Sequence, residues 1–326
     1  MYIVTGGAGM IGSAAVWELN RQGIEDILVV DNLASKEKWK NLVCLKYTDY
    51  MHRDEFLQKI KNDEIKNVQG IVHMGACSST TEKNADFLME NNLHYTQEVF
   101  LFAMRNDIRM VNASSAATYG GGELGFSTDI ETTLKLKPLN MYGYSKHLFD
   151  LWCIRNNYLD KVVNLKFFNV YGPNEYHKDT MRSVACKAFE AINEKGFLQL
   201  FSSDKPEYSH GDQKRDFIYV KDCVKVIAWF LLENQQIGGI FNVGTGQART
   251  WNSLAHAVFS AMGMPSRIKY IPMPEQLRGK YQYFTEANMV WLKKYNYPYS
   301  FTSLEDGVKD YIQNYLLTNN PYLSSI

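Results

Sequence analysis

Short apolar runs alternate with longer stretches of helical periodicity along most of the chain. Between the first two runs, apolar residues from Ile11 to Leu19 recur at the spacing of one buried helix face, and Gly23 follows as a stop signal. This alternation is typical of a parallel sheet with helices on both faces, so we predict an α/β fold with a doubly wound parallel sheet. The runs expected as strands are Tyr2–Thr5, Ile27–Val30, Gly70–Met74, Met110–Ala113, Val162–Phe167 and Gly239–Val243.

A change of composition after Phe168 predicts a second domain. Two polar stretches, at residues 172–174 and 202–214, have the composition of long loops over a site. The alternating pattern returns at Asp216 and continues to residue 245. We therefore predict a larger domain of residues 1–168 plus 216–245. A smaller, discontinuous α/β substrate-binding domain would comprise residues 169–215 plus 246–326, with a helix near 304–315 that packs back.

The charge balance disfavours two classes of partner. Thirty-five Lys and Arg residues balance 35 Asp and Glu residues, so no overall field attracts nucleic acid or an anionic membrane. The longest apolar run, Val226 to Leu232, has seven residues, whereas a membrane span needs about 20. A strand-like run begins at Tyr2, which leaves no room for a targeting segment. We expect a soluble protein that binds neither nucleic acid nor membrane.

Cysteine and histidine usage argues against disulfides and metals. The five cysteines are widely spaced without a CxxC motif, and the seven histidines form no HxH or HExxH cluster. An odd set of unclustered cysteines is typical of a reducing compartment. We expect a cytoplasmic protein with no metal site.

A glycine-rich turn follows the first predicted strand and opens the first predicted helix. Gly6 permits a tight turn, Gly9 lets the backbone approach a pyrophosphate, and Gly12 allows close packing of helix on strand. Asp31 ends the second predicted strand, 19 residues beyond Gly12, where a carboxylate can accept from an adenosine ribose. These features predict a dinucleotide-binding (Rossmann) domain.

The choice between NAD and NADP stays open at this point. Asp31 favours NAD, because a carboxylate repels a 2′-phosphate. Basic residues that follow it would neutralise such a phosphate locally, or would form an ordinary solvated loop; they are Lys36, Lys38, Lys40 and Arg53.

Tyr142 and Lys146 have the i, i+4 spacing that places two side chains on one helix face. A neighbouring ammonium lowers the pKa of a phenol toward the range where it exchanges a proton with an alcohol. Ser115 follows the predicted strand Met110–Ala113, at the carboxyl end where α/β sheets bind ligands. Tyr144 cannot make the same pair with Lys146.

Together these residues resemble the extended branch of the short-chain dehydrogenase/reductase superfamily, which acts on nucleotide sugars. The resemblance implies that Ser115, Tyr142 and Lys146 form a catalytic triad, with Lys146 also holding the nicotinamide ribose. The segment 215–220 is similar to the RDFxxV motif of the branch, whose Arg contacts the substrate diphosphate. The segment 169–173 is similar to its NVYGP loop.

Two further segments narrow the resemblance. Dehydratases of this branch carry an Asp-Glu pair where this chain has Ala116 and Ala117, so dehydration is disfavoured. Residues 73–82 and 174–181 resemble the ADP-L-glycero-D-manno-heptose 6-epimerase family. That family inverts carbon 6 of the heptose in ADP-D-glycero-D-manno-heptose through a 6-keto intermediate, supplies lipopolysaccharide core and usually uses NADP. Its members are homo-oligomers, pentamers among them, and the Lys that matches Lys178 is a second acid/base.

The resemblance also implies a set of binding residues. Those for the cofactor, besides the three glycines, Asp31, Tyr142 and Lys146, are Met10, Ile11, Asn32, Lys38, Arg53, Met74, Gly75, Ala76, Cys77, Ser78 and Asn91. Those for the substrate are Asn169, Val170, Lys178, Thr180, Lys187, Phe201, Ser202, Ser203, Asp204, Arg215 and Tyr281.

This chain departs from the family pattern in places. Met74, Thr180 and Lys187 replace the usual Glu, Ser and His, the segment 202–204 differs, and the stretch 205–213 is longer. The alternatives are an NAD-dependent UDP-sugar 4-epimerase with the same triad, a net nucleotide-sugar reductase, and a non-catalytic NAD(P)-binding protein.

Overall fold

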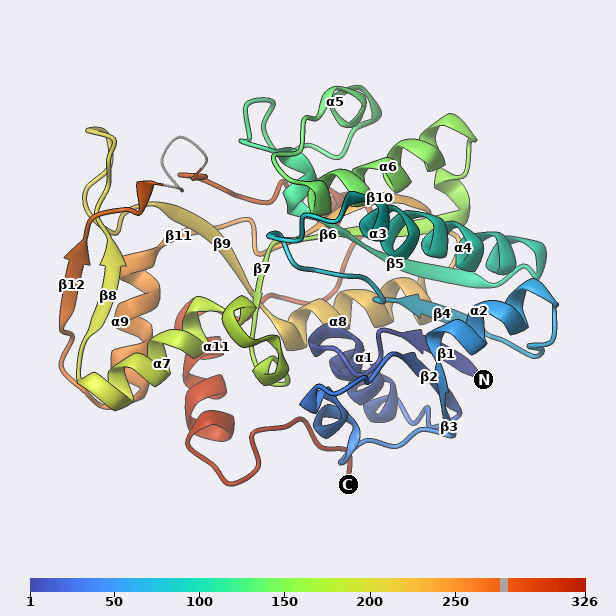
Figure 1. The fold of residues 1–326 in the computed structure, drawn as a ribbon, viewed down its shortest axis with the longest axis horizontal. Coiled ribbons are helices and arrows are strands. Elements are labelled where there is room, and N and C mark those ends of the chain that lie inside the picture. The colour runs from blue at the N-terminus through green and yellow to red at the C-terminus, as the bar shows by residue number, and fades with distance from the viewer. Residues whose placement is uncertain (276–280) are drawn as a thin grey trace.

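A seven-stranded parallel sheet forms the larger unit of the computed structural model, which describes residues 1–275 and 281–326 (Figure 1). The strand order is β10-β6-β5-β4-β1-β2-β3, so the predicted doubly wound sheet is confirmed. The strands are β1 (Tyr2–Thr5), β2 (Ile27–Asp31), β3 (Asp49–His52), β4 (Gly70–His73), β5 (Arg109–Ser115), β6 (Val162–Phe167) and β10 (Gly239–Val243). The short edge strand β3 was not predicted, because its sequence is polar and half-exposed.

Helices cover both faces of this sheet. Alternate strand residues point to opposite faces, so Ile3 and Val4, both fully buried, belong to two different core clusters. On the Val4 face lie α1 (Met10–Arg21) and α8 (Val220–Ala228), and on the Ile3 face lie α2 (Arg53–Lys61), α4 (Tyr95–Arg105) and α6 (Met141–Arg155). The short helix α3 (Ala85–Leu88) precedes α4. Within the described ranges, no helix is long and apolar enough to cross a bilayer.

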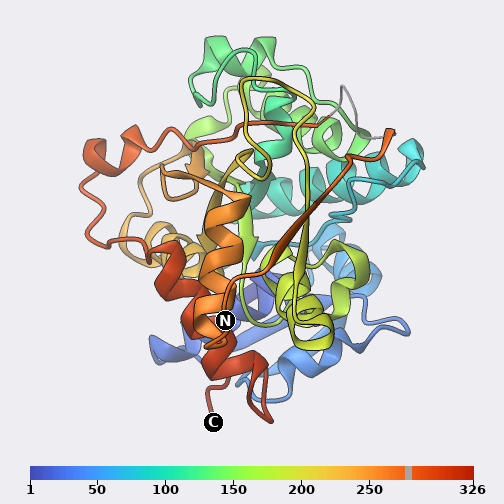
Figure 2. The ribbon, with the colours of Figure 1, turned by 90° about the vertical axis from the view of Figure 1, so that its left-hand side faces the viewer.

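The second unit contains two small sheets and packs beside the first. One sheet has the order β11-β9-β7 and the other pairs β12 with β8. Figure 2 shows α9 and α11 standing side by side at its outer end. The elements are β7 (Asn169–Tyr171), α7 (Val184–Lys195), β8 (Leu198–Phe201), β9 (Lys214–Tyr219), β11 (Ala248–Thr250), α9 (Trp251–Ala261), β12 (Ile268–Ile271) and α11 (Leu304–Tyr311), with α5 (Ile130–Lys135) and α10 (Val290–Lys294) elsewhere on the chain.

The predicted division at residues 168, 216 and 245 stays a prediction. In the structure β9 belongs to a small sheet, whereas the following helix α8 packs on α1 and β10 joins the large sheet. The predicted last helix forms as α11 and packs on α9. After it the chain returns to the first unit, where the Ser325 amide donates to the Cys44 carbonyl over 2.8 Å.

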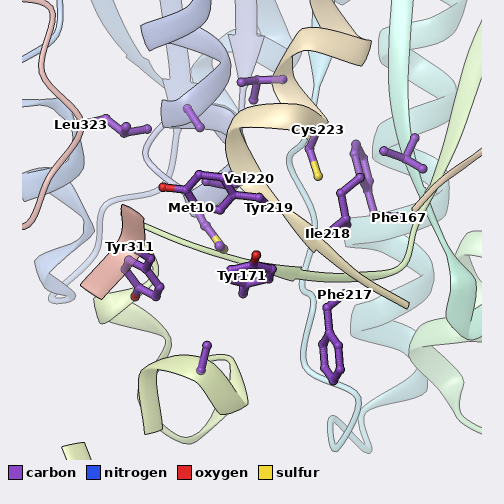
Figure 3. Packing of buried hydrophobic residues seen from close by; sticks show 14 of the residues in the cluster. Met10, Phe167, Tyr171, Phe217, Ile218, Tyr219, Val220, Cys223, Tyr311 and Leu323 are labelled. Atoms are coloured by element: carbon purple, nitrogen blue, oxygen red, sulfur yellow. The ribbon is translucent and has the colours of Figure 1, made fainter. Parts of the chain in front are cut away.

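One buried hydrophobic cluster spans both units, with Met10 of α1 in the same cluster as Tyr171 and Tyr219 (Figure 3). Tyr171 of β7 and Tyr219 of β9 pack with ring centroids 5.4 Å apart, and α11 closes over them. A Cβ on Gly307 of α11 would lie 2.1 Å from the Tyr171 hydroxyl, so only glycine fits there. Fully buried Asp216 adds four contacts, because its carboxylate accepts from the amides of Thr245, Gly246 and Ala287 and from the Thr245 hydroxyl. Strand β9 is therefore held firmly where its side chains approach the site.

Candidate active site

A cavity of about 780 Å³ opens at the carboxyl ends of β1 and β4. The strand order reverses between these two strands, which is where doubly wound sheets bind ligands. Every residue predicted to bind the cofactor lines this one cavity. They are Gly6, Gly9, Met10, Ile11, Gly12, Asp31, Asn32, Lys38, Arg53, Met74, Gly75, Ala76, Cys77, Ser78, Asn91, Tyr142 and Lys146.

The glycine-rich turn leaves no room for side chains at two of its positions. A Cβ on Gly6, whose φ is +63°, would lie 2.6 Å from the backbone nitrogen of Gly75. A Cβ on Gly12 would lie 2.1 Å from the Gly6 carbonyl oxygen. Gly9 precedes α1, and no side chain caps this helix or places an acid in its first turn. The uncapped N-terminus therefore offers amide donors and a positive dipole end to an anion such as pyrophosphate.

Asp31 is the last residue of β2, and its carboxylate already forms an ion pair with Lys38. Its carboxylate accepts from the Ala8 amide over 2.8 Å, and Lys38 lies 2.5 Å away. Arg53 donates to the Asn91 side chain, and its guanidinium lies 5.6 Å from the Tyr95 ring centroid. Two cations thus line the cavity near a carboxylate that one of them neutralises.

Asn92 holds the loop after β4, although no motif singled it out. It is fully buried, and its side-chain oxygen accepts from the Cys77 amide over 2.9 Å. Its side-chain nitrogen donates to the Cys77 carbonyl and to the Ser145 hydroxyl, both over 3.0 Å. This one amide fixes the cofactor-side loop to helix α6.

The three triad residues come from β5 and α6 and line the same cavity. The Ser115 hydroxyl accepts from the Ala117 amide over 3.1 Å, which fixes Ser115 at the end of β5. Asn140 caps α6, so Tyr142 and Lys146 lie in its first two turns on one face. Tyr144, 44% exposed, does not line the cavity.

The expected lowering of the Tyr142 pKa does not occur in the protein alone. Burial raises the pKa of the Tyr142 phenol, and hydrogen bonding with Ser115 opposes that rise. Lys146 instead donates to the Ala113 carbonyl over 2.8 Å. Burial lowers the pKa of Lys146 to about 8, which leaves it mainly charged at neutral pH.

Lys178 approaches the cavity from the other unit, in the short 3₁₀ segment Tyr176–Met181. Its ammonium lies 3.4 Å from the Met10 sulfur, and burial lowers its pKa while Glu175 opposes that change. Buried Glu175 accepts from the Ser183 hydroxyl over 2.7 Å and so anchors the segment. The geometry places the Lys178 ammonium beside the glycine-rich turn.

The chain end braces the segment that carries Lys178. The Asn174 side chain donates to the Ser13 hydroxyl over 2.9 Å and accepts from the Leu323 amide over 3.0 Å. The Tyr176 hydroxyl donates to the Pro321 carbonyl over 2.8 Å. No sequence signal pointed to these contacts, because they join residues far apart along the chain.

The residues predicted for the substrate fall into two groups. Asn169, Val170 and Lys178 line the cavity. Outside its lining are Thr180, Lys187, Phe201, Ser202, Ser203, Asp204, Arg215 and Tyr281. Exposed Lys187 donates to the Thr180 carbonyl over 3.3 Å, and Asp204 accepts from the Tyr283 hydroxyl.

Arg215 is tied to the cavity through Trp251, which the sequence did not single out. The guanidinium lies 5.1 Å from the Tyr281 ring centroid and 5.7 Å from that of Trp251. Trp251 lines the cavity and donates to the Tyr281 hydroxyl over 2.8 Å. Burial lowers the pKa of Arg215, and its guanidinium donates to the backbone carbonyls of Lys214 and Gln282. This buried cation suits an anionic ligand group at the cavity edge.

Comparison with known proteins gives consistent results. Residues 2–244 match the model of the NAD dependent epimerase/dehydratase family. An ADP-L-glycero-D-manno-heptose-6-epimerase of Nitratidesulfovibrio vulgaris is 60% identical over 99% of this chain and 100% of its own. One of Fusobacterium nucleatum is 47% identical over 99% of this chain and 100% of its own. The Helicobacter pylori enzyme of that name superposes with a TM-score of 0.82 at 25% identity, covering 96% of this chain and 95% of that one.

The close packing at Gly12 yields a first prediction. Gly12→Ala places a methyl against the Gly6 carbonyl and must displace the turn, so affinity for the nicotinamide nucleotide should fall at least tenfold. Calorimetric titration of the apo-protein would measure this. Gly263→Ala is the control, because a Cβ there meets nothing within 4 Å, although its positive φ adds local strain. Unchanged affinity in Gly12→Ala would contradict the placement of the pyrophosphate at this turn.

Proposed function

The chain belongs to the NAD dependent epimerase/dehydratase family, and from this premise we propose that it inverts carbon 6 of the heptose in ADP-D-glycero-D-manno-heptose. Full-length similarity to relatives named for this activity supports the proposal. The observation that carries it is geometric. Two candidate acid/base groups, Tyr142 and Lys178, line the same cavity as the glycine-rich turn although they come from different units.

The cofactor in this proposal is NADP. The turn fits a dinucleotide, since its glycines allow close backbone approach and α1 is uncapped. Lys38 offsets the charge of Asp31, and Arg53, which also pairs with Asp54 over 3.1 Å, lines the same cavity together with Lys36, so a 2′-phosphate would find cationic donors there. Tyr142 and Lys146 would hold the nicotinamide ribose.

When bound between the glycine-rich turn and Lys146, the nicotinamide would supply reversible hydride transfer at carbon 6, so that a 6-keto sugar could form and be reduced on its opposite face. Tyr142 and Lys178 then each serve one orientation of the carbon 6 oxygen, removing or returning its proton. Assistance of this kind is worth roughly 10²–10⁴-fold for each group. Arg215 would bind the diphosphate and so keep the ADP moiety in place while the carbonyl end turns about the bond between carbons 5 and 6.

Several finer features belong to the same proposal. The protein would work in the cytoplasm as a homo-oligomer, in the supply of heptose for lipopolysaccharide core. Residues 1–168 plus 216–245 would bind the cofactor and the remainder the sugar. The Ala116 and Ala117 positions, which lack carboxylates, make elimination of water unfavourable, since that step needs an additional acid and base.

Cofactor preference is the second prediction. Lys38→Ala combined with Arg53→Ala should lower the ratio of NADP affinity to NAD affinity at least tenfold, because a lost charge-assisted hydrogen bond costs about 1.5–3 kcal/mol. Titration of the apo-protein with both nucleotides measures the ratio. Lys40→Ala is a matched control, since Lys40 pairs with Glu37 over 2.8 Å and does not line the cavity. An unchanged ratio in the double variant would reject the NADP assignment.

The third prediction concerns the two acid/base groups. Tyr142→Phe and Lys178→Met should each reduce epimerisation at least 10²-fold while cofactor stays bound, because each removes one proton-transfer group. Conversion of ADP-D-glycero-D-manno-heptose would be followed by NMR. Tyr144→Phe, at the exposed neighbour, should be close to wild type. Full activity of Lys178→Met would remove its catalytic role. No conversion of the heptose by the wild-type protein would instead favour an NAD-dependent UDP-sugar 4-epimerase, to be tested with UDP-glucose.

The hydrogen on carbon 6 provides the fourth prediction and the direct test of the reaction. In a hydride shuttle this hydrogen leaves and returns without contact with water. Product formed in D₂O should therefore carry no deuterium at carbon 6, and substrate deuterated there should keep its label. Mass spectrometry and NMR after many turnovers decide the matter. Solvent deuterium approaching one atom per product molecule would exclude the shuttle in favour of proton abstraction.

A further inference from the structure

A buried ion pair lies directly behind the triad and takes no part in the reaction as described. Asp150 of α6 and Lys166 of β6 are both fully buried, and the Lys166 ammonium lies 3.0 Å from the Asp150 carboxylate. Removing two charges from water is costly, and a buried pair often stabilises a fold no more than apolar residues of the same volume would. Stability alone is therefore a weak reason for this pair.

The bonds around the pair are unevenly distributed. One Asp150 oxygen, Oδ2, accepts a hydrogen bond from the Ser114 hydroxyl over 2.9 Å. The same oxygen pairs with the Lys166 ammonium. Lys166 also donates to the Thr118 hydroxyl over 2.7 Å and lies 4.8 Å from the Tyr119 ring centroid. The other Asp150 oxygen, Oδ1, is buried without a hydrogen-bond partner in the part of the chain that the structure describes. The Asp150 carboxylate is therefore held in one orientation through Oδ2, while the negative charge on Oδ1 has no hydrogen-bond donor.

Asp150 lies one helical turn beyond Lys146, on the same face of α6. Lys146 is itself buried, and its ammonium donates to a neutral carbonyl, that of Ala113. Burial lowers the pKa of Lys146 to about 8, and Asp150 is the charge that opposes this. Without Asp150, the ammonium would face a low-dielectric site with no anion.

The other titratable groups near Lys146 do not supply this charge. His73 of β4 is buried and bonded to two hydroxyls, and burial lowers its pKa to about 3, so it is neutral. Tyr142, on α6, has its pKa raised by burial and carries no charge at neutral pH. Lys166 of β6 is a cation paired with Asp150, so it supplies no negative charge to Lys146. His147 precedes Lys146's helical neighbour Asp150 on α6, and burial lowers the pKa of its imidazole, so it supplies no negative charge either.

We propose that Asp150 is a positioning residue of the redox site, which keeps Lys146 in its charged form from one turn along α6 while Lys166 and Ser114 hold the Asp150 carboxylate in place. The role in catalysis rests on the proposed function, since a charged Lys146 is what would bind the nicotinamide ribose and favour phenolate at Tyr142. The charge state of Lys146 itself does not depend on which sugar is converted.

The test is a titration of Lys146 in the cofactor-loaded full-length protein. Lysine labelled with ¹³C at Cε reports each ammonium by NMR, and Lys146→Arg identifies the Lys146 signal. Asp150→Asn keeps the shape of the side chain and an acceptor for Ser114 but removes the charge. Losing an anion disfavours the ammonium, so Lys146 should lose its proton at a pH at least one unit lower than in the wild type.

A second variant guards against misfolding. Asp150→Asn leaves Lys166 buried without a counter-ion, so the double variant Asp150→Asn with Lys166→Met removes both charges. We expect it to fold and still to show the lowered Lys146 titration. Asp222→Asn is the matched control, because Asp222 is a buried carboxylate that pairs with Lys225 over 3.0 Å on α8, and it should leave Lys146 unchanged.

Activity supplies the second arm. If the proposed function holds, the alkaline limb of the pH–rate profile should move down by the same amount as the Lys146 titration. A Lys146 signal that titrates at the wild-type pH in the double variant would overturn the proposal and make the pair purely structural. A shifted signal together with no conversion of the heptose by wild-type protein would instead reject the proposed function and leave the role of Asp150 intact.

Discussion

The close approach of two backbone segments at Gly6 is the constraint on which the rest of the site depends. The turn after β1 passes so near the start of the loop after β4 that a Cβ on Gly6 would meet the Gly75 backbone at 2.6 Å. This contact lies where the strand order reverses, so it sets how the floor of the cavity is shaped. The loop that follows is fixed in turn by Asn92, which connects it to α6 and thereby to the triad.

Desolvated cations lie in the cavity and at its edge. Burial lowers the pKa of Lys146, Lys178 and Arg215 alike, and no carboxylate lies within 4 Å of any of them among residues 1–275 and 281–326. Positive charge kept out of water in this way disfavours an empty site and favours a dianionic ligand, because the ligand supplies the missing counter-charge. In the proposed function, affinity for a nucleotide diphosphate would come from relieving the cost of leaving these cations without an anionic partner.

Local patterns in the sequence were sufficient for six of the seven strands of the large sheet and for a set of residues that line one cavity. The strand runs at Tyr2–Thr5, Val162–Phe167 and Gly239–Val243 form as predicted, since buried parallel strands are short apolar segments between helices. The edge strand β3 has no such pattern, because half-exposed residues pair there on one side only. Asn92 and Trp251 could not be predicted either, since each acts through contacts with residues distant in sequence. The composition of segment 202–214 predicted a long loop, but it did not predict the hydrogen bond from the Asp204 amide to the Tyr283 hydroxyl.

The contacts between the chain end and the Lys178 segment bear on the order in which the protein is completed during synthesis. The strands of the large sheet up to β6, with their helices, leave the ribosome early and can form local structure while the rest is made. The segment that carries Lys178 is held by hydrogen bonds from Leu323 and to Pro321, about 140 residues further along the chain. A nascent chain can therefore form its glycine-rich turn early, whereas the segment that carries Lys178 gains these hydrogen bonds only once residues 321–323 have been made and have folded back.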